Sequence, residues 1–260
     1  MVQKTRETRA QSRERLREER ARQAAAEARR RRTLQLGLVG VVALAVIGIG
    51  IAVVATRGST VQTNATVPAG ITDTKGYPNG SATAPVLDIW EDFQCPNCGG
   101  FEAANKSKIE DLISSGKAKV VYHTWNFLDR GNTGQNAESS SRAAIAAGCA
   151  WDQGKFLQFH DQVFANQPAN EGDGWSDAQL ETFAKNAGVP DMPTFNQCLA
   201  SQKYKGFLTQ VNAQADKQQV TGTPSFLVNG HLLNYSNAYS TGGWAAVGNY
   251  VIQQIDQAQS

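Results

Sequence analysis

The 260-residue chain is 41% hydrophobic and 18% charged, a composition typical of a folded protein, which excludes a largely disordered chain. The net charge of +2 hides a division: residues 1–33 contain twelve Lys or Arg and five Glu, a charge of +7, whereas the remainder carries −5. The length allows one large domain or two small ones.

The chain opens with a basic tail, residues 1–33, followed by an apolar segment, residues 34–55. The segment carries no charge and would span roughly 33 Å as a helix, enough to cross a bilayer and more than the apolar part of a cleaved signal peptide. We therefore expect an uncleaved transmembrane helix. Because basic flanks stay in the cytoplasm, we expect a single-pass protein of the cell membrane, with everything after Arg57 outside the cytoplasm. A nucleic-acid-binding role for the tail is less well supported, because the span follows directly.

Residues 56–84 are rich in Thr, Gly, Asn, Ser and Pro, and they predict a tether to a folded domain at 85–260. The domain should open with a buried strand at 86–90, then a helix at 101–115 and a strand at 118–124.

Residues 136–204 change character, because apolar stripes at helical spacing predict a block of short helices. Within this block, Ser176 and Gln179 predict a capped helix start, and Gly188 predicts the end of that helix. A hairpin around Asn229-Gly230 and a last helix at 243–258 follow. This order predicts an α/β domain with one helical insertion.

Cys95-Pro96-Asn97-Cys98 lies between the first strand and the first helix. At a helix N-terminus, unpaired N–H groups and a partial positive charge favour a thiolate, and pKa values of about 3.5 to 7 occur in this motif. We expect Cys95 to be the catalytic nucleophile and Cys98 the resolving thiol. Pro96 costs no hydrogen bond there, and Asn97 in place of a histidine predicts a less strongly oxidising pair.

A second motif, Gly222-Thr223-Pro224, leads directly into the strand Ser225-Phe226-Leu227-Val228. Together with Phe93-Gln94-Cys95-Pro96-Asn97-Cys98, it resembles the DsbA-like branch of the thioredoxin superfamily over about residues 70–258. The resemblance includes the Ala-rich helix that ends in Cys149 and the segment at 154–161.

The resemblance implies a thioredoxin-like fold with an inserted helical domain and a protein thiol–disulfide oxidoreductase that needs no cofactor and no metal. Thr223-Pro224 would be a cis peptide facing the cysteines, with the Thr223 backbone available to a substrate strand. Reduced exported proteins and a quinone-linked membrane reoxidase are the partners it implies, and nucleic acid is not among them.

The family's buried acid, six residues before the first cysteine, is replaced here by Ile89. The proton acceptor for Cys98 is therefore open among Asp88, Glu91 and Asp92, although acids at a strand end are more often solvated.

Cys149 and Cys198 lie 49 positions apart in the predicted insertion. We interpret them as a structural disulfide, since a loop of that size contributes roughly 4 kcal/mol in the chain-entropy model. A second redox pair is the alternative, but it lacks a local Cys-x-x-Cys arrangement.

The histidines and two aromatic residues are interpreted as structural residues before any functional role is considered. His123, His160 and His231 are assigned to packing or the surface rather than to catalysis. Trp125 and Phe127 are assigned to the core, with a groove for unfolded substrates as the alternative.

The leading functional hypothesis is an enzyme that introduces disulfides into exported proteins through Cys95 and Cys98. The alternative enzymatic function is a reductase or isomerase that acts on the same substrates. The reduction potential of the Cys95–Cys98 couple distinguishes these activities from disulfide formation. A non-catalytic zinc-binding or protein-binding module is the alternative of a different class. It fits poorly, because structural zinc sites usually pair two local ligand clusters.

Overall fold

The computed structural model describes residues 65–71, 75–131 and 137–259. The predicted basic tail and transmembrane segment lie outside these ranges. Within them, no helix combines the length and the apolar character needed to cross a membrane.

The described part is a mixed α/β domain that begins with three strands interrupted by one helix and continues through a run of helices to a hairpin and a last helix. In chain order the elements are β1 (Tyr77–Gly80), β2 (Val86–Glu91), α2 (Pro96–Ser114), β3 (Lys119–Thr124), η1 (Phe127–Gly131), α3 (Ser139–Trp151), α4 (Phe156–Ala165), α5 (Asp177–Asn186), α6 (Met192–Ala200), α7 (Lys205–Lys217), β4 (Ser225–Val228), β5 (His231–Leu232) and α8 (Ser236–Gln259).

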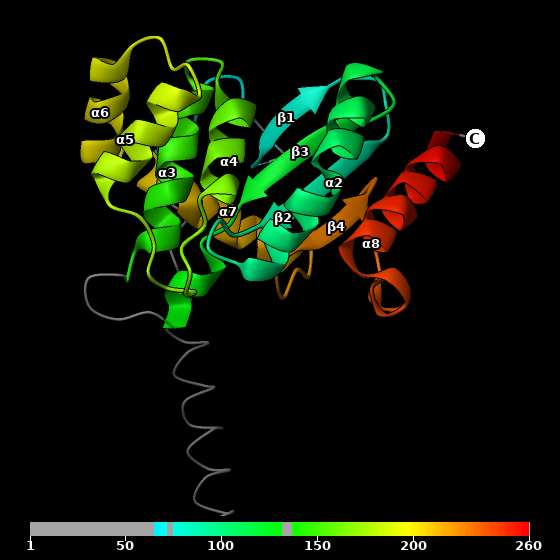
Figure 1. The fold of residues 1–260 in the computed structure, drawn as a ribbon. Coiled ribbons are helices and arrows are strands. Elements are labelled where there is room, and N and C mark those ends of the chain that lie inside the picture. The colour runs from blue at the N-terminus through cyan, green and yellow to red at the C-terminus, as the bar shows by residue number, and fades with distance from the viewer. Residues whose placement is uncertain (1–64, 72–74, 132–136, 260) are drawn as a thin grey trace, which may run out of the picture. The chain divides into compact units, whose positions relative to one another are not determined.

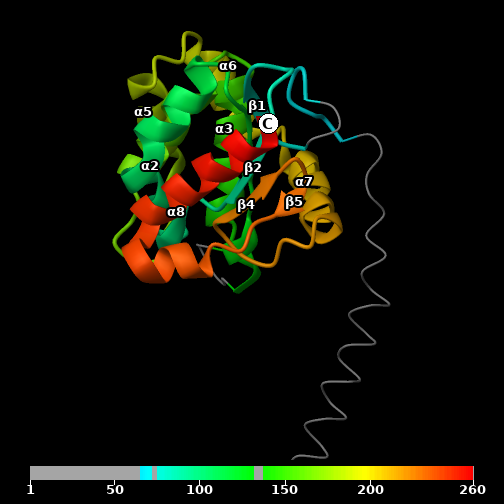
Figure 2. The ribbon, with the colours of Figure 1, turned by 90° about the vertical axis from the view of Figure 1, so that its right-hand side faces the viewer.

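The five strands form one sheet in the order β1-β3-β2-β4-β5 (Figure 1). Strand β2 lies at the centre, parallel to β3 and antiparallel to β4, with Ile89 opposite both Tyr122 and Phe226. Helices α2 and α8 pack together on one side of the sheet, and α7 lies on the other (Figure 2). Because both faces are covered, Leu87, Ile89 and Trp90 of β2 are all fully buried.

Helices α3, α4, α5 and α6 gather beside the sheet, at the left of Figure 1, and confirm the predicted helical insertion. The predicted helix start is also confirmed, because the Ser176 side chain accepts a hydrogen bond from the Gln179 N–H and the Gln179 side chain accepts one from the Ser176 N–H. Helix α7 was not predicted, and it carries the helical region past residue 204 to Lys217.

Strand β1 corrects the predicted tether. Residues 77–80 pair antiparallel with β3, and Tyr77 is fully buried, stacked on Phe156 with ring centroids 4.3 Å apart. The sequence Tyr-Pro-Asn-Gly lacks the apolar alternation of a strand, and it is tolerated because an edge strand can do without the N–H of Pro78. The folded domain therefore begins before residue 85.

Two helices begin earlier than their apolar patterns predicted. The apolar pattern placed α2 from residue 101, but the helix starts at Pro96, where the Cys-x-x-Cys motif predicted a helix N-terminus; Gly99 and Gly100 hide the first turn from the apolar pattern. Helix α8 starts at Ser236 instead of residue 243, and it is kinked at Gly242 and Gly243, where Gly243 takes φ +61°.

Candidate active site

The two cysteines of the Cys-x-x-Cys motif lie at the start of α2. Cys95 is the N-cap residue and Cys98 follows in the first turn, with Pro96 at the first helical positions as predicted. Both are free thiols, 6% and 1% exposed respectively. Cys95 is thus the sulfur nearer to solvent, and Cys98 lies beneath it.

The pKa values of the two thiols are shifted in opposite directions. A hydrogen bond from the Cys98 thiol lowers the pKa of Cys95 to about 6, with further help from Thr223 and from the backbone N–H groups of Asn97 and Cys98, while burial opposes the shift. Burial raises the pKa of Cys98 well above its usual value, and the neighbouring Cys95 and Glu91 act in the same direction. At neutral pH Cys95 is therefore mostly a thiolate and Cys98 a thiol, as a nucleophile and a resolving thiol require.

The loop at Thr223 and Pro224 faces this pair, and the peptide bond between them is cis, as predicted. The Cys95 thiol donates to the Thr223 carbonyl at 3.4 Å. The Thr223 hydroxyl is buried and makes no hydrogen bond of ordinary length to any described residue, yet it stabilises the Cys95 thiolate. Since only the thiol form can donate, ionisation of Cys95 frees the Thr223 carbonyl for another donor, such as a substrate backbone.

The loop is held in place from both sides. The Tyr235 hydroxyl donates to the Pro224 carbonyl at 2.7 Å, and the Ser225 hydroxyl donates to the Gly222 carbonyl at 2.7 Å. The position of Thr223 against Cys95 is therefore built into the β4–β5 hairpin.

A buried carboxylate–histidine pair includes Glu91, whose charge acts on Cys98. His160 of α4 donates from Nε2 to Glu91 Oε1 of β2 at 2.7 Å, and both side chains are buried. Glu102 of α2 completes the cluster, with one ligand atom from each of the three residues within 4.8 Å of the others.

Burial raises the pKa of Glu102 to about 8, which keeps this carboxyl protonated at neutral pH. Burial alone lowers the pKa of His160, but the charge of Glu91 and hydrogen bonds to Asp161 and Glu91 outweigh it and raise the pKa to about 10. The cluster thus holds an imidazolium and a neutral carboxyl group, and the charge of its Glu91 acts on Cys98.

The matching family model, described as "Thioredoxin", covers residues 72–243, about two thirds of the chain. The chain belongs to the thioredoxin family.

Comparison with solved structures shows which thioredoxin-family proteins this chain is similar to. Oxidised DsbA from Mycobacterium tuberculosis is 30% identical, with a TM-score of 0.53 over 70% of this chain and 97% of that one. The reduced disulfide bond oxidoreductase DsbG from the same organism is 28% identical, with a TM-score of 0.54 over 72% of this chain and 97% of that one. The protein is a thiol–disulfide oxidoreductase of the DsbA family.

Among curated relatives, the Na(+)/H(+) antiporter NhaA 3 of Salinispora tropica is 31% identical over 157 residues, which are 60% of this chain and 22% of that protein. The chain thus spans only about a fifth of the length of the first curated relatives it matches, so their named activities are not transferred to it.

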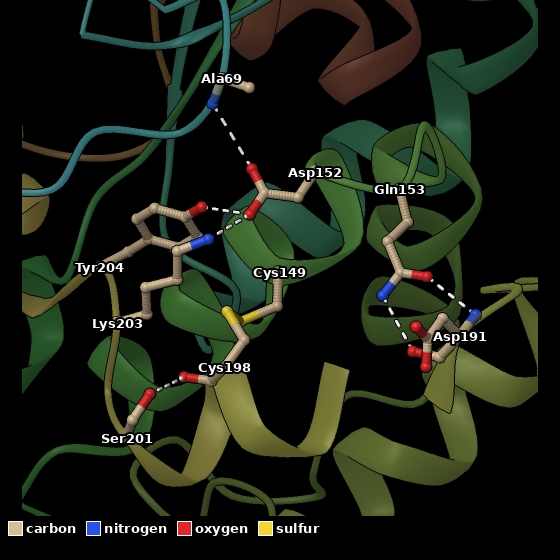
Figure 3. Close-up of a disulfide and its surroundings, with 9 residues drawn as sticks. All are labelled: Ala69, Cys149, Asp152, Gln153, Asp191, Cys198, Ser201, Lys203 and Tyr204. Atoms are coloured by element: carbon tan, nitrogen blue, oxygen red, sulfur yellow. Dashed lines mark hydrogen bonds and ion pairs between the residues drawn. A yellow bond between two sulfur atoms is a disulfide. The ribbon is translucent and has the colours of Figure 1, made fainter. Parts of the chain in front are cut away.

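The predicted structural disulfide is confirmed, since Cys149 of α3 is bonded to Cys198 of α6 (Figure 3). Beside it, Asp152 accepts hydrogen bonds from Lys203 at 2.7 Å and from the Tyr204 hydroxyl. The alternative of a second redox pair finds no support in this arrangement. Cys149 and Cys198 are also unable to complete a zinc site with Cys95 and Cys98, because they bond to each other.

The expectation that the acids at the end of β2 are solvated is wrong. Asp88, Glu91 and Asp92 are all buried, at 6%, 1% and 0% exposed. Asp88 Oδ1 lies 2.8 Å from His123 Nε2, while Asp92 accepts hydrogen bonds from the Leu128 N–H and the Ser140 hydroxyl. Burial raises the pKa of Asp92 to about 7. Of the three, Glu91 is the one whose charge acts on Cys98.

The three histidines are packed or lie at the surface, as predicted. His231 is exposed, and His123 packs flat against Trp90 with ring centroids 4.1 Å apart. His160 is also packed, and the same side chain belongs to the cluster with Glu91 and Glu102. Trp125 is buried, and Phe127 packs on it at 4.9 Å, which supports the core assignment.

Sequence reasoning missed Gln167, which follows α4. Its side-chain amide donates to the Phe93 carbonyl at 2.7 Å and to the Cys95 carbonyl at 3.0 Å, so the insertion holds the loop that leads into the cysteine pair. Nothing local in the sequence marks this residue. Glu102 could have been found, because it is a charged residue on the helix stripe that also carries Phe101, Asn105 and Ile109.

Proposed function

We propose that this oxidoreductase introduces disulfides into reduced proteins outside the cytoplasm and is held in the cell membrane by residues 34–55. The observation that carries the proposal is the lowered pKa of Cys95, about 6. Stabilising the Cys95 thiolate stabilises the reduced enzyme, so the oxidised enzyme takes electrons from substrate thiols more readily.

The reaction begins when a substrate thiolate attacks Cys95 in the Cys95–Cys98 disulfide. The bond between the two cysteines breaks, a mixed disulfide forms at Cys95, and the electron pair leaves on Cys98. A second substrate thiolate then attacks the substrate sulfur of the mixed disulfide, and Cys95 departs as a thiolate. The enzyme keeps two electrons, which a membrane reoxidase, quinone-linked in this family, must remove.

Cys95 suits the second step, because its sulfur is a poor base and hence a good leaving group. Pro96 and Asn97 are exposed beside it, so a polypeptide can reach this side of the motif. The Thr223 carbonyl, freed when Cys95 ionises, would accept a hydrogen bond from that polypeptide.

A reductase or isomerase is the second candidate. A pKa of about 6 for Cys95 lies nearer to the value of about 7 in thioredoxin than to about 3.5 in the strongest oxidant of the family. Asn97 supplies no positive charge that would lower the pKa further. Both features favour an intermediate potential.

Equilibration of the full-length protein with glutathione buffers measures the potential of the Cys95–Cys98 couple. A value near −120 mV supports the oxidase, and one near −270 mV would replace it with the reductase.

Oxidation of a reduced model protein tests which residues act. Cys95→Ser should abolish the reaction. Cys98→Ser keeps the nucleophile, and with a substrate supplied as a mixed disulfide it should accumulate a trapped complex at Cys95. Full activity in the Cys95→Ser variant would contradict the proposal.

The membrane location rests on the uncharged segment at 34–55 and on the Cys149–Cys198 bond, since disulfides persist mainly outside the cytoplasm. The full-length protein should stay in the membrane fraction after alkaline carbonate extraction, and protease added outside the cell should digest the domain. Extraction into the soluble fraction, or a protected domain, would remove this part of the proposal.

A further inference from the structure

Cys98 must gain and lose a proton in every catalytic cycle. When the Cys95–Cys98 bond breaks, the electron pair stays on the Cys98 sulfur, and burial raises the pKa of this group so that it binds a proton. The proton leaves again when the disulfide is remade. Cys98 is only 1% exposed, so the proton needs a partner inside the protein.

The titratable and charged groups around this sulfur and around the Glu91–His160 pair come from five parts of the fold. They are Glu91 of β2, Cys95, Glu102 and Lys106 of α2, Tyr122 of β3, His160 and Asp161 of α4, and Tyr235 after β5. Glu91 is the carboxylate among them that acts on Cys98 directly.

Glu91 has one oxygen engaged and one free. Oε1 accepts the 2.7 Å hydrogen bond from His160, whereas Oε2 is buried and has no hydrogen-bond partner among the described residues. A carboxylate that takes a proton at Oε1 and then turns about its Cγ–Cδ bond presents that proton on its other side, so it transfers one proton in net terms.

The imidazole of His160 is held so that it can give and recover that proton. Its Nδ1 lies 3.5 Å from Asp161 Oδ1, and Asp161 forms an ion pair with Lys106 at 2.8 Å. The rings of Tyr122 and Phe164 both lie 4.8 Å from the imidazole, so the ring is enclosed except at its two nitrogens. The same residues could ligate a cation, but the 2.7 Å contact leaves no space for an ion between Nε2 and Oε1.

We propose that Glu91 and His160 act together as the proton donor and acceptor for Cys98. When substrate breaks the enzyme disulfide, His160 passes its Nε2 proton to Oε1 of the Glu91 carboxylate, and after the carboxyl group turns, the same proton passes to the Cys98 thiolate. The products are a mixed disulfide at Cys95, a Cys98 thiol and a neutral His160, and the proton returns when Cys98 is reoxidised.

This pair takes over the role of the acid that Ile89 has replaced, and from a position two residues further along β2 on the same face of the sheet. Glu102, Asp161 and Lys106 are positioning residues that set the charge around it. A pocket of about 220 Å³ beside Glu102 and Asp161 reaches the cluster from the surface, so external buffer can replace the pair slowly when it is removed. The inference rests on the thiol–disulfide chemistry and holds for either direction of electron flow.

The chain contains a matched control. Asp88 Oδ1 and His123 Nε2 form a second buried carboxylate–histidine contact, at 2.8 Å. Asp88 and Glu91 lie on the same strand three residues apart, so their side chains are on opposite faces of the sheet. Only Glu91 lies on the face covered by α2, where Cys98 is.

The test is the rate at which oxidised full-length protein forms a mixed disulfide with a small thiol, measured by rapid acid quench from pH 6 to 9 with a chelator present. Glu91→Gln and His160→Gln should slow the reaction at pH 7 at least about tenfold, whereas Asp88→Asn should stay within about twofold of the wild type. The deficit of the two variants should grow as the pH rises, because protons from solvent become scarcer.

A deficit that is the same at every pH, or an equal deficit in Asp88→Asn, would overturn the proposal, since both describe a structural defect. If the buried variants do not fold, Asp161→Asn at the partly exposed end of the cluster should show a smaller deficit with the same pH trend, and no trend there would also overturn the proposal. An inactive wild type would instead count against the oxidoreductase chemistry itself.

Discussion

The two cysteine pairs of this domain are similarly buried but have different roles: one is suited to thiol–disulfide exchange and the other stabilises the fold. Cys98 and Cys149 are each 1% exposed, so burial does not distinguish the pairs. Cys95 and Cys98 lie in one turn of α2, where a disulfide closes almost no loop, whereas Cys149 and Cys198 join two helices across 49 positions. The short pair has one thiol of lowered pKa, one of raised pKa, and nearby groups that can exchange protons, as thiol–disulfide exchange requires. The long pair has neither, and it has the loop closure that stabilises a fold.

The largest effect is expected on stability, when the Cys149–Cys198 disulfide is removed. Cys149→Ala/Cys198→Ala should lower the free energy of unfolding by about 4 kcal/mol, because the unfolded chain regains the freedom of a 49-residue loop. Urea unfolding measures the change, with Cys95→Ala/Cys98→Ala as the control that should cost less than about 1 kcal/mol. Equal losses in the two double variants would show that the pairs do not divide chemistry and stability in this way.

The next effect concerns the short pair alone. Alkylation of reduced protein by iodoacetamide should rise as the pH increases through about 6, since the thiolate reacts and the pKa of Cys95 is lowered to about 6. At pH 7, Cys98 should react at least about 100-fold more slowly, which corresponds to about 2.7 kcal/mol. Peptide mapping by mass spectrometry assigns the label, and similar rates at both sulfurs would contradict this difference in pKa.

A smaller effect is expected at the loop that faces Cys95. Thr223→Val removes the hydroxyl that stabilises the thiolate, so the alkylation midpoint should rise by about 1 pH unit, near 1.4 kcal/mol. Thr221→Val, at an exposed position two residues earlier, is the control and should leave the midpoint in place. A midpoint unchanged by both variants would leave Cys98 and the helix N-terminus as the whole cause of the acidity.

The smallest effect is expected at Gln167, where the helical insertion contacts the loop that leads into Cys95. Gln167→Leu leaves the carbonyls of Phe93 and Cys95 without their donor and should lower the free energy of unfolding by about 1 kcal/mol. Gln158→Leu, exposed on α4, provides the comparison and should have less effect. Thermal unfolding distinguishes them, and a reversed order would mean that the insertion does not support the active-site loop.

Features set by near neighbours could be predicted from the sequence. The strand before Cys95, the thiolate environment at a helix N-terminus and the capping of α5 by Ser176 all depend on residues a few positions apart. The Cys149–Cys198 bond was predictable because four cysteines, two of them in one redox motif, leave one other pair.

Features that depend on distant partners could not be predicted. β1 is a strand because β3 offers it an edge and Tyr77 finds Phe156, although its own sequence has no strand pattern. Glu91 and His160 are 69 positions apart, and each looks ordinary alone. Only the fold shows that they share a buried site, which is why the acids of β2 were wrongly expected in solvent.

The two glycines that follow Cys98 decide which positions of the motif can vary. A Cβ atom at Gly99 would lie 2.1 Å from Gln167 Oε1, and one at Gly100 would lie 2.7 Å from Trp244 Cδ1. Larger residues there would displace the Gln167 side chain, which holds the active-site loop, or the Trp244 ring of α8, whereas Pro96 and Asn97 are exposed to solvent. A library built to retune the redox potential should therefore randomise only positions 96 and 97, and natural diversification of this enzyme faces the same restriction.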